Sequence, residues 1–401
     1  MHDLLQIAIT KSQHIMKIIS DSIKYVGVDD PEMDLFESQY HTPDGMCYNS
    51  YVILDEKVAI MDTVDIRKTD EWMDNVKAVL GNRTPDYVVV QHLEPDHSGS
   101  LAVLLKAYPD TTVVASHKAI QFIGQFFEGM EFKSMAVCEG DSLSLGKHNL
   151  TFVTAPMVHW PEVIVSYEST EQVLFSADGF GKFGVYEADA DDWACEARRY
   201  YFNICGKYGN NVAALLKKAS GLTINKILPL HGPILEGEKM AEALRLYTLW
   251  SHYEPEAEGI LVAYASIHGG TKACAERFAE MLKEKGAKKV SLFDLCRDDM
   301  AEAIEDAFKF GKLVLAAASY DGDVFPPMHY FLHKLILKGY RNRKVGIIEN
   351  GTWAPSAAKA MRALLAQMKD IEIVEPQVTI KSRMKSSDIP ALEALSDAIV
   401  S

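Results

Sequence analysis

The sequence predicts a two-domain protein of mixed α/β class, and three observations support this prediction. With 401 residues, the chain is too long for one typical hydrophobic core. Its first part mixes short apolar runs with helical patterns, which indicates strands and helices in one domain. Beyond residue 259 the pattern changes to strict alternation of strand and helix, which is typical of a doubly wound parallel sheet.

The boundary between the domains is expected in the polar, acidic stretch from Ser251 to Gly259, which contains proline and glycine. We therefore predict a first domain at 1–252, a linker at 253–258 and a second domain at 259–401.

Local patterns predict the individual elements. Two apolar runs, 51–54 and 58–61, are separated by three polar residues and predict a hairpin. Helical periodicity predicts helices at 70–80 and 101–108, the first of which ends at Gly81. The strands predicted for the second domain are 260–265, 290–295, 313–318, 345–349 and 371–374.

Charge and composition exclude several classes of protein. A formal charge of −15 argues against nucleic acid or an anionic membrane surface as a partner. No apolar stretch approaches the roughly 20 residues that span a bilayer, and the start lacks a signal-peptide pattern, so the expected location is cytoplasmic. The six cysteines include no C-x-x-C pair, which predicts free thiols rather than disulfides or a rubredoxin-type iron centre.

The strongest functional signal is the segment Gln91–Gly99, which directly follows an apolar run that predicts a buried strand. Its ionisable side chains are His92, Glu94, Asp96 and His97. In an extended segment alternate side chains point the same way, so His92, Glu94 and Asp96 should converge while His97 turns to a neighbouring point. Imidazoles with carboxylates suit first-row metals, and a carboxylate-rich set favours iron or manganese over structural zinc.

Three later residues also follow apolar runs: His159, Asp178 and His231. Each alone would be interpreted as a satisfied histidine or a capping aspartate. Together with the first segment they make seven candidate ligands, enough for two metals, and loops at strand ends are where enzymes commonly gather such residues.

Other polar and aromatic residues near these motifs are assigned structural roles. Asp62 and Asp65 follow the predicted hairpin and could support the metal ligands from behind, but turn or capping roles are expected for both. His148 lies in a turn between strands and is expected at the surface. Trp160 and Tyr201 are expected in the core, although either could form a wall of the site.

The second domain offers a candidate phosphate cradle where its first strand meets the following helix. The residues there are Ser266, Ile267, His268, Gly269, Gly270 and Thr271. Free backbone N–H groups and the helix dipole favour an anion at such a place. Two further strand-end loops contain Ser319, Tyr320, Asp321, Gly322 and Asp323, and Asn350, Gly351, Thr352 and Trp353. A nicotinamide site is the competing interpretation, but Gly-x-Gly-x-x-Gly is absent.

The pattern His92-x-Glu94-x-Asp96-His97, followed by His159, Asp178 and His231, resembles the metal signature of the metallo-β-lactamase superfamily in its flavodiiron protein variant, also called A-type flavoproteins. Many hydrolases of the superfamily have His where this chain has Glu94, which favours a non-haem diiron site over a zinc hydrolase. The second domain resembles flavodoxins, although His268 stands where they commonly have Thr. The resemblance covers essentially the whole chain.

This resemblance implies a metallo-β-lactamase-like αββα sandwich followed by a flavodoxin-like, doubly wound five-stranded parallel sheet, without a rubredoxin extension. By resemblance, His92, Glu94 and His159 would hold one iron, Asp96 and His231 the other, and Asp178 would bridge them. In some family members the residue corresponding to His97 does not bind iron. The second domain would hold FMN, with Trp353 able to stack on the flavin.

The implied function is reduction of dioxygen to water, of nitric oxide to nitrous oxide, or of both, which serves oxygen reduction and nitric oxide detoxification. The implied assembly is a head-to-tail homodimer or a tetramer, in which the flavin of one chain faces the irons of another. Rubredoxin or a reduced deazaflavin coenzyme would donate electrons. Two alternatives stay open: a zinc-dependent hydrolase with an attached flavodoxin domain, and a flavin electron carrier whose first domain has lost its chemistry.

Overall fold

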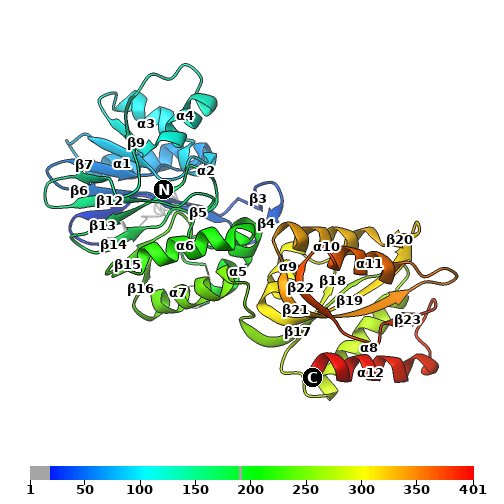
Figure 1. Ribbon diagram of the computed structural model, residues 1–401. Coiled ribbons are helices and arrows are strands. Elements are labelled where there is room, and N and C mark those ends of the chain that lie inside the picture. Colours follow the sequence, from blue (N-terminus) through cyan, green and yellow to red (C-terminus); the bar gives the residue numbers. More distant parts are fainter. Residues whose placement is uncertain (1–18, 189–191) are drawn as a thin grey trace, which may run out of the picture.

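The computed structural model describes residues 19–188 and 192–401, which form two lobes side by side (Figure 1). The first lobe contains β1 to α7 and the second contains β17 to α12. The start of the chain, on which the signal-peptide expectation rests, lies outside the described residues. Within the described ranges, every helix is too short or too polar to cross a lipid bilayer.

The first lobe is built on two sheets, as the predicted sandwich requires. The first sheet contains, in spatial order, β1 (Ile23–Tyr25), β6 (Tyr51–Leu54), β7 (Val58–Met61), β8 (Tyr87–Val90), β9 (Thr112–Ser116) and β10 (Lys133–Val137). The second contains β11 (Ser142–Ser144), β12 (Asn149–Thr154), β13 (Ile164–Glu168), β14 (Val173–Phe175), β15 (Lys226–Leu228) and β16 (Leu235–Glu236). Alternate strand residues point to opposite faces, so Val89 packs in the core between the sheets, whereas Val88 and Val90 pack under the helices.

Helices cover the outer face of each sheet (Figure 1). Those on the first sheet are α1 (Thr69–Leu80), α3 (Leu101–Ala107) and α4 (His117–Phe126). Those on the second are α5 (Trp193–Ile204), α6 (Gly209–Ala219) and α7 (Gly237–Ser251). In α1 the buried residues Trp72, Val76 and Leu80 recur at helical spacing, and Gly81, with φ of 58°, ends the helix as predicted.

Short elements complete the first lobe. Two small pairs are β2 (Val28–Asp30) with β5 (Met46–Tyr48) and β3 (Leu35–Phe36) with β4 (Tyr40–His41). The 3-10 helices are η1 (Ile66–Lys68) and η2 (Gly206–Tyr208). The predicted hairpin is confirmed, because β6 and β7 pair antiparallel with Tyr51 opposite Met61.

The second lobe contains the predicted parallel sheet. Its order is β18 (Val290–Asp294), β17 (Ala257–Ala265), β19 (Phe310–Tyr320), β21 (Arg341–Asn350) and β22 (Lys369–Ile373). Two short strands were not predicted: β20 (Asp323–Val324) pairs antiparallel with β19, and β23 (Val378–Ile380) pairs parallel with β21.

Helices cover both faces of this sheet, as a doubly wound fold requires. One face packs on α8 (Gly270–Glu284) and α12 (Ile389–Val400), the latter preceded by η3 (Ser386–Asp388). The other face packs on α9 (Met300–Lys309), α10 (Pro326–Leu337) and α11 (Ala357–Leu365). Strand β17 begins at Ala257, inside the range predicted as the linker, and the division at 253–258 stays a prediction.

The two lobes are joined by a buried contact between α5 and α9. Phe202 of α5 stacks on Phe308 of α9 with ring centroids 4.2 Å apart. Arg198 of α5 forms ion pairs with Glu256, at the start of the second lobe, and with Glu305 of α9. One hydrophobic core runs through this contact and includes residues of both lobes. The lobes are therefore held in a defined relative position.

His148 lies beside the turns that join β6 to β7 and β13 to β14. The prediction that it lies at the surface is wrong, because the residue is only 5% exposed. Its Nδ1 lies 2.8 Å from Asp55 Oδ2, in the turn between β6 and β7. Its Nε2 lies 3.2 Å from Glu171 Oε1, in the turn between β13 and β14. Burial opposes a charged imidazole, but these two carboxylates outweigh burial and raise the pKa of His148.

We predict that His148→Ala lowers stability more at pH 6 than at pH 9. Because the pKa is raised in the folded state, the imidazolium stabilises the fold at low pH and this contribution is lost as pH rises through the folded-state pKa. At pH 6 the variant lacks two charge-assisted hydrogen bonds, so we expect its free energy of unfolding to be lower by roughly 2 kcal/mol. Thermal unfolding across this pH range measures it, and an equal loss at both pH values would contradict it.

Candidate metal centre

The segment that begins the site is positioned by a buried hydrogen bond to Asp62. Beyond β8, the backbone N–H of Gln91 donates to Asp62 Oδ1 at 2.7 Å, and Gln91 Nε2 donates to Asp62 Oδ2 at 2.9 Å. Burial raises the pKa of Asp62 to about 6 despite these bonds. Asp62 therefore supports the loop that carries the ligands, which was the alternative to its expected turn or capping role, whereas Asp65 caps η1 as predicted.

The prediction that His92, Glu94 and Asp96 converge in one extended segment is wrong. Pro95 begins the short helix α2 (Pro95–Ser98), with Glu94 as its N-cap residue. Because the chain turns into a helix there, Asp96 points away from Glu94 and lies with His97.

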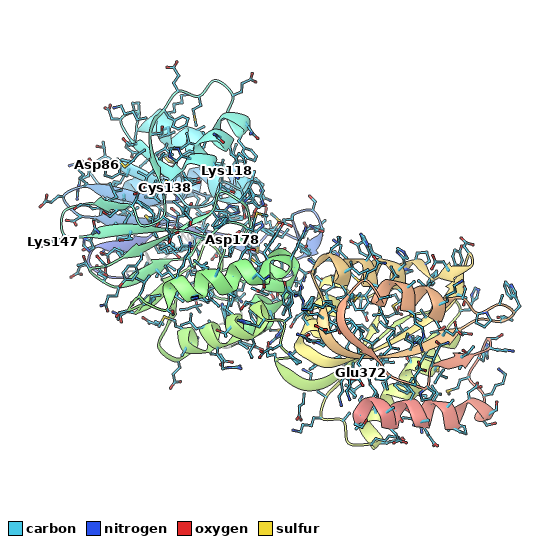
Figure 2. The ribbon with its side chains drawn as sticks, viewed as in Figure 1. Asp86, Lys118, Cys138, Lys147, Asp178 and Glu372 are labelled. Atoms are coloured by element: carbon cyan, nitrogen blue, oxygen red, sulfur yellow. The ribbon has the colours of Figure 1, made fainter. Side chains whose placement is uncertain are left out.

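The seven predicted ligands meet in two adjacent groups. The first group contains His92, Glu94, His159 and Asp178, and the second contains Asp96, His97 and His231. Within each group one ligand atom per residue lies within 4.8 Å of the others. His159 follows β12, Asp178 follows β14 and His231 follows β15, so strand ends of the second sheet meet the loop that follows β8. Figure 2 places Asp178 at the end of the first lobe opposite Lys147.

Asp178 lies between the two groups. Its Oδ2 is 3.1 Å from His159 Nε2 in the first group, and its Oδ1 is 3.0 Å from His97 Nε2 in the second. In the first group Glu94 Oε2 lies 3.0 Å from His159 Nε2 and 3.1 Å from His92 Nε2. A carboxylate with one oxygen toward each group has the geometry of a ligand that bridges two metal ions.

The outer nitrogens of two ligand imidazoles are bound by protein acceptors. His92 Nδ1 donates to Glu162 Oε1 at 2.8 Å, and Glu162 also accepts from the backbone N–H of Leu93 at 3.0 Å. His231 Nδ1 donates to the Cys47 carbonyl at 2.7 Å. When these rings are neutral, a proton on Nδ1 leaves the Nε2 lone pair directed into the site, free to bind a metal. Sequence reasoning missed Glu162, and no local pattern marks it.

Several buried polar atoms in the site form no hydrogen bond with the described residues, although some of them lie within ion-pair distance of one another. They are both carboxylate oxygens of Asp96, both ring nitrogens of His97, Oδ1 of Asp178 and Nε2 of His231. Buried polar groups are otherwise almost always paired, because an unpaired group costs about 1–3 kcal/mol. Imidazole nitrogens and carboxylate oxygens left open in this way fit a centre that binds metal ions.

The electrostatics of the site without metal follow from its mixed charges. Burial disfavours charged imidazoles, but neighbouring carboxylates outweigh burial and raise the pKa of His159 to about 9. Burial would also raise the pKa of Asp178, but His97 and His92 hold it well below its usual range. Without metal, the imidazoles of the site therefore carry protons where they would otherwise bind metal ions, so metal binding would displace these protons.

Aromatic rings enclose both groups. Trp160 lies with its ring centroid 5.3 Å from that of His92 and stacks on Phe126. It therefore forms a wall of the site as well as packing on the core, whereas Tyr201 is fully buried in the core as predicted. On the other side, the rings of Phe36 and Tyr200 lie 5.5 and 5.6 Å from His231.

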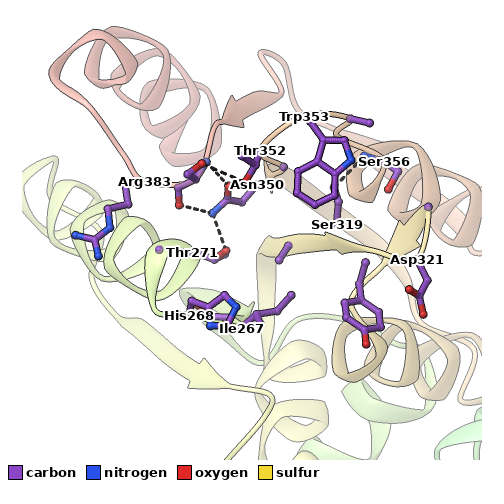
Figure 3. Close-up of a pocket in the computed structure, with 18 residues that line it drawn as sticks. Ile267, His268, Thr271, Ser319, Asp321, Asn350, Thr352, Trp353, Ser356 and Arg383 are labelled. Atoms are coloured by element: carbon purple, nitrogen blue, oxygen red, sulfur yellow. Dashed lines mark hydrogen bonds between the residues drawn. The ribbon is translucent and has the colours of Figure 1, made fainter.

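The second lobe carries a cavity of about 610 Å³ at the carboxyl ends of β17, β19 and β21 (Figure 3). All three predicted loops contribute to it, but Gly269 and Asp323 do not line it. Lining residues that sequence reasoning missed include Ser356, Ser382 and Arg383. The last two follow β23, a strand that was not predicted.

Comparisons with known proteins agree with both halves of the molecule. The ODP family of β-lactamases matches residues 46–232. The chain is 28% identical to the nitric oxide reductase of Moorella thermoacetica, over 92% of this chain and 94% of that protein. It is also 28% identical to the anaerobic nitric oxide reductase flavorubredoxin of Aeromonas hydrophila, over 86% of this chain and 72% of that protein.

Two solved structures share the whole fold. Rubredoxin oxygen:oxidoreductase from Desulfovibrio gigas matches with a TM-score of 0.90 and 24% identity, over 96% of this chain and 97% of that chain. The flavodiiron protein from Giardia intestinalis matches with a TM-score of 0.88 and 24% identity, over 96% and 95%. Fold and ligand groups define a β-lactamase-like metal-binding domain fused to a flavodoxin-like domain. Over nearly its whole length the chain is thus similar in sequence to a nitric oxide reductase and in fold to a flavodiiron protein.

We predict that Glu162→Gln weakens metal binding by about 10- to 100-fold, because His92 loses the charged acceptor that fixes its ring. Competition with a chelator measures the affinity. Glu139→Gln is the matched control, since the Glu139 side chain is 49% exposed and pairs with Lys218 at the surface. Equal affinity in the two variants would refute this role of Glu162.

Proposed function

We propose that this protein is an oxidoreductase that reduces dioxygen to water, nitric oxide to nitrous oxide, or both, at a non-haem diiron site fed with electrons through FMN. The observation that carries the proposal is the pair of ligand groups that share Asp178, in a chain that also has a flavodoxin-like cavity. Relatives named nitric oxide reductase and rubredoxin oxygen:oxidoreductase support the same chemistry.

The ligand assignment follows the two groups. His92, Glu94 and His159 would hold one iron, His231, Asp96 and His97 the other, and Asp178 would bridge them. The distances support His97 as a ligand, because its Nε2 lies 3.2 Å from Asp96 Oδ2 and 3.0 Å from Asp178 Oδ1. Three carboxylates among seven ligands favour iron over structural zinc.

Two bound irons and one FMN would together supply the four electrons that convert dioxygen to two waters, while two electrons convert two nitric oxide molecules to nitrous oxide and water. The seven side chains would hold the irons in position, and the residues packed around them orient these side chains and exclude bulk water. Access is expected at Glu94, whose side chain is 16% exposed, because the side chains of His92 and His231 have no exposed surface.

We also propose a head-to-tail homodimer, in which the cavity of one chain faces the metal centre of the other. Strands β20 and β23 lie at the end of the second lobe that is remote from the first lobe (Figure 1). The adjoining cavity therefore lies far from the ligand groups of the same chain. Its rim exposes Trp353 at 90%, Tyr320 at 45% and Ile267 at 40%, an apolar surface suited to a partner.

The electron donor is proposed to be a separate molecule, either rubredoxin or a reduced deazaflavin coenzyme. The similarity to the Desulfovibrio gigas protein, a rubredoxin oxygen:oxidoreductase, supports the first of these. The cytoplasmic location and a further assembly into tetramers stay predictions.

The function is tested with protein of known iron and FMN content that is reduced without air and then given dioxygen or nitric oxide. We expect gas consumption together with flavin reoxidation in the original protein. Asp178→Asn should lose most of the iron and the gas consumption while it retains FMN. Asp110→Asn is the control, because this side chain is 97% exposed. Zinc in place of iron, or full turnover by an iron-free variant, would refute the proposal.

The dimer is tested with Trp353→Glu, which places a charge in the proposed contact. We expect a lower mass in sedimentation and slower electron transfer from FMN to iron that depends on protein concentration. Leu292→Glu, on the edge strand β18 and away from the cavity, should keep the original mass. A monomer that transfers electrons at the full rate would rule out the dimer as the working unit.

A further inference from the structure

The charges around the cavity of the second lobe are arranged with opposite signs at its two ends. Among the described residues that line it, Arg383 is the only lysine or arginine and Asp321 is the only acid. Arg383 lies on the side of His268 and Thr271, whereas Asp321 lies at the opposite end, beyond Ser319 (Figure 3). Arg383 therefore lies at the end of the cavity where α8 begins.

The guanidinium of Arg383 has no hydrogen-bond or ion-pair partner within residues 19–188 and 192–401. Its neighbour Lys385 differs, because Lys385 Nζ donates to the carbonyls of Lys381 and Arg383. The chain carries a formal charge of −15, and other arginines, such as Arg198, Arg199 and Arg362, form ion pairs with carboxylates. An unpaired arginine at a cavity wall is therefore available for a ligand.

The backbone before Arg383 is held against the start of α8 by Asn350. The Asn350 amide accepts from the backbone N–H of Ser382 at 2.9 Å and donates to the Ser382 carbonyl at 3.0 Å. It also lies 3.2 Å from Thr271 Oγ1. A Cβ on Gly270 would lie 2.2 Å from the Ser382 carbonyl, so glycine permits this close approach. The loop that carries Arg383 and the phosphate cradle are thus one unit.

The cradle alone does not neutralise a phosphate monoester. A helix N-terminus offers the equivalent of about half a positive charge, whereas a phosphate monoester carries between one and two negative charges near pH 7. A guanidinium can supply the remaining charge and bind two phosphate oxygens at once.

We propose that Arg383 is the cationic ligand of the flavin phosphate and makes the cavity selective for a flavin phosphomonoester over the unphosphorylated flavin. This inference rests on the proposed FMN site. It assigns to the loop after β23 a role in binding and selectivity, separate from the loops that would contact the ring.

The test is titration of flavin-free full-length protein with FMN and with riboflavin, which lacks the phosphate, followed by quenching of flavin fluorescence. We expect Arg383→Met to weaken FMN binding by about 10- to 100-fold, the range for a charge-assisted hydrogen bond, and to leave riboflavin binding unchanged. Arg383→Lys should recover part of the loss. Added salt should weaken FMN binding to the original protein more than to Arg383→Met.

Lys381→Met is the matched control, because it removes the same charge from the same loop at a residue that does not line the cavity. An equal loss in this variant, an equal loss for both flavins, or no loss in Arg383→Met would overturn the proposal. Unchanged riboflavin binding by Arg383→Met also shows that the variant is folded. If the original protein binds neither flavin, the FMN site of the proposed function fails as well, and this outcome differs from each of the others.

Discussion

The contact on which the site depends is the carboxylate of Asp178, buried between two groups of ligands. One oxygen lies 3.1 Å from His159 Nε2 and the other lies 3.0 Å from His97 Nε2. This arrangement requires the end of β14, in the second sheet, to meet the turn that follows β8, in the first sheet. The sandwich core holds that register, because Phe175 at the end of β14 packs in the core between the two sheets. A shift of one residue in β14 would turn Asp178 away from the ligands.

The rest of the molecule constrains how such a centre can be used. The Glu162 carboxylate and the Cys47 carbonyl hold the His92 and His231 imidazoles in orientations that suit metal binding. The buried contact of α5 with α9 fixes the two lobes relative to each other. A rigid chain whose cavity lies far from its own metal centre favours electron transfer between chains, which is the physical basis of the proposed dimer.

Local periodicity predicted individual strands and helices and the parallel sheet of the second lobe, whereas the αββα sandwich of the first lobe was predicted only from the resemblance to a known family. The alternation of βα units after residue 259 and the hairpin of β6 and β7 are examples of predictions from periodicity. The candidate ligands were found because each follows an apolar strand. The expected convergence of Asp96 with His92 failed where Pro95 turned the chain into a helix, a choice that local alternation does not encode.

Residues that depend on distant partners could not be found in this way. Glu162 and His148 contact segments far away in the sequence, and Arg383 follows β23, a strand too short to give a periodic signal. Glutamate, histidine and arginine are all common at protein surfaces, so the residue type alone carries no signal. The partner or the cavity beside each residue is visible only in the folded structure.

The central claim is that Asp178 bridges two iron ions held by the two ligand groups. Crystals of the iron-loaded protein, measured by anomalous scattering on either side of the iron absorption edge, test this claim most directly. If Asp178 bridges the irons, we expect two iron peaks, one in each ligand group, with one carboxylate oxygen of Asp178 directed at each. A single peak, or two peaks that belong to zinc, would contradict it.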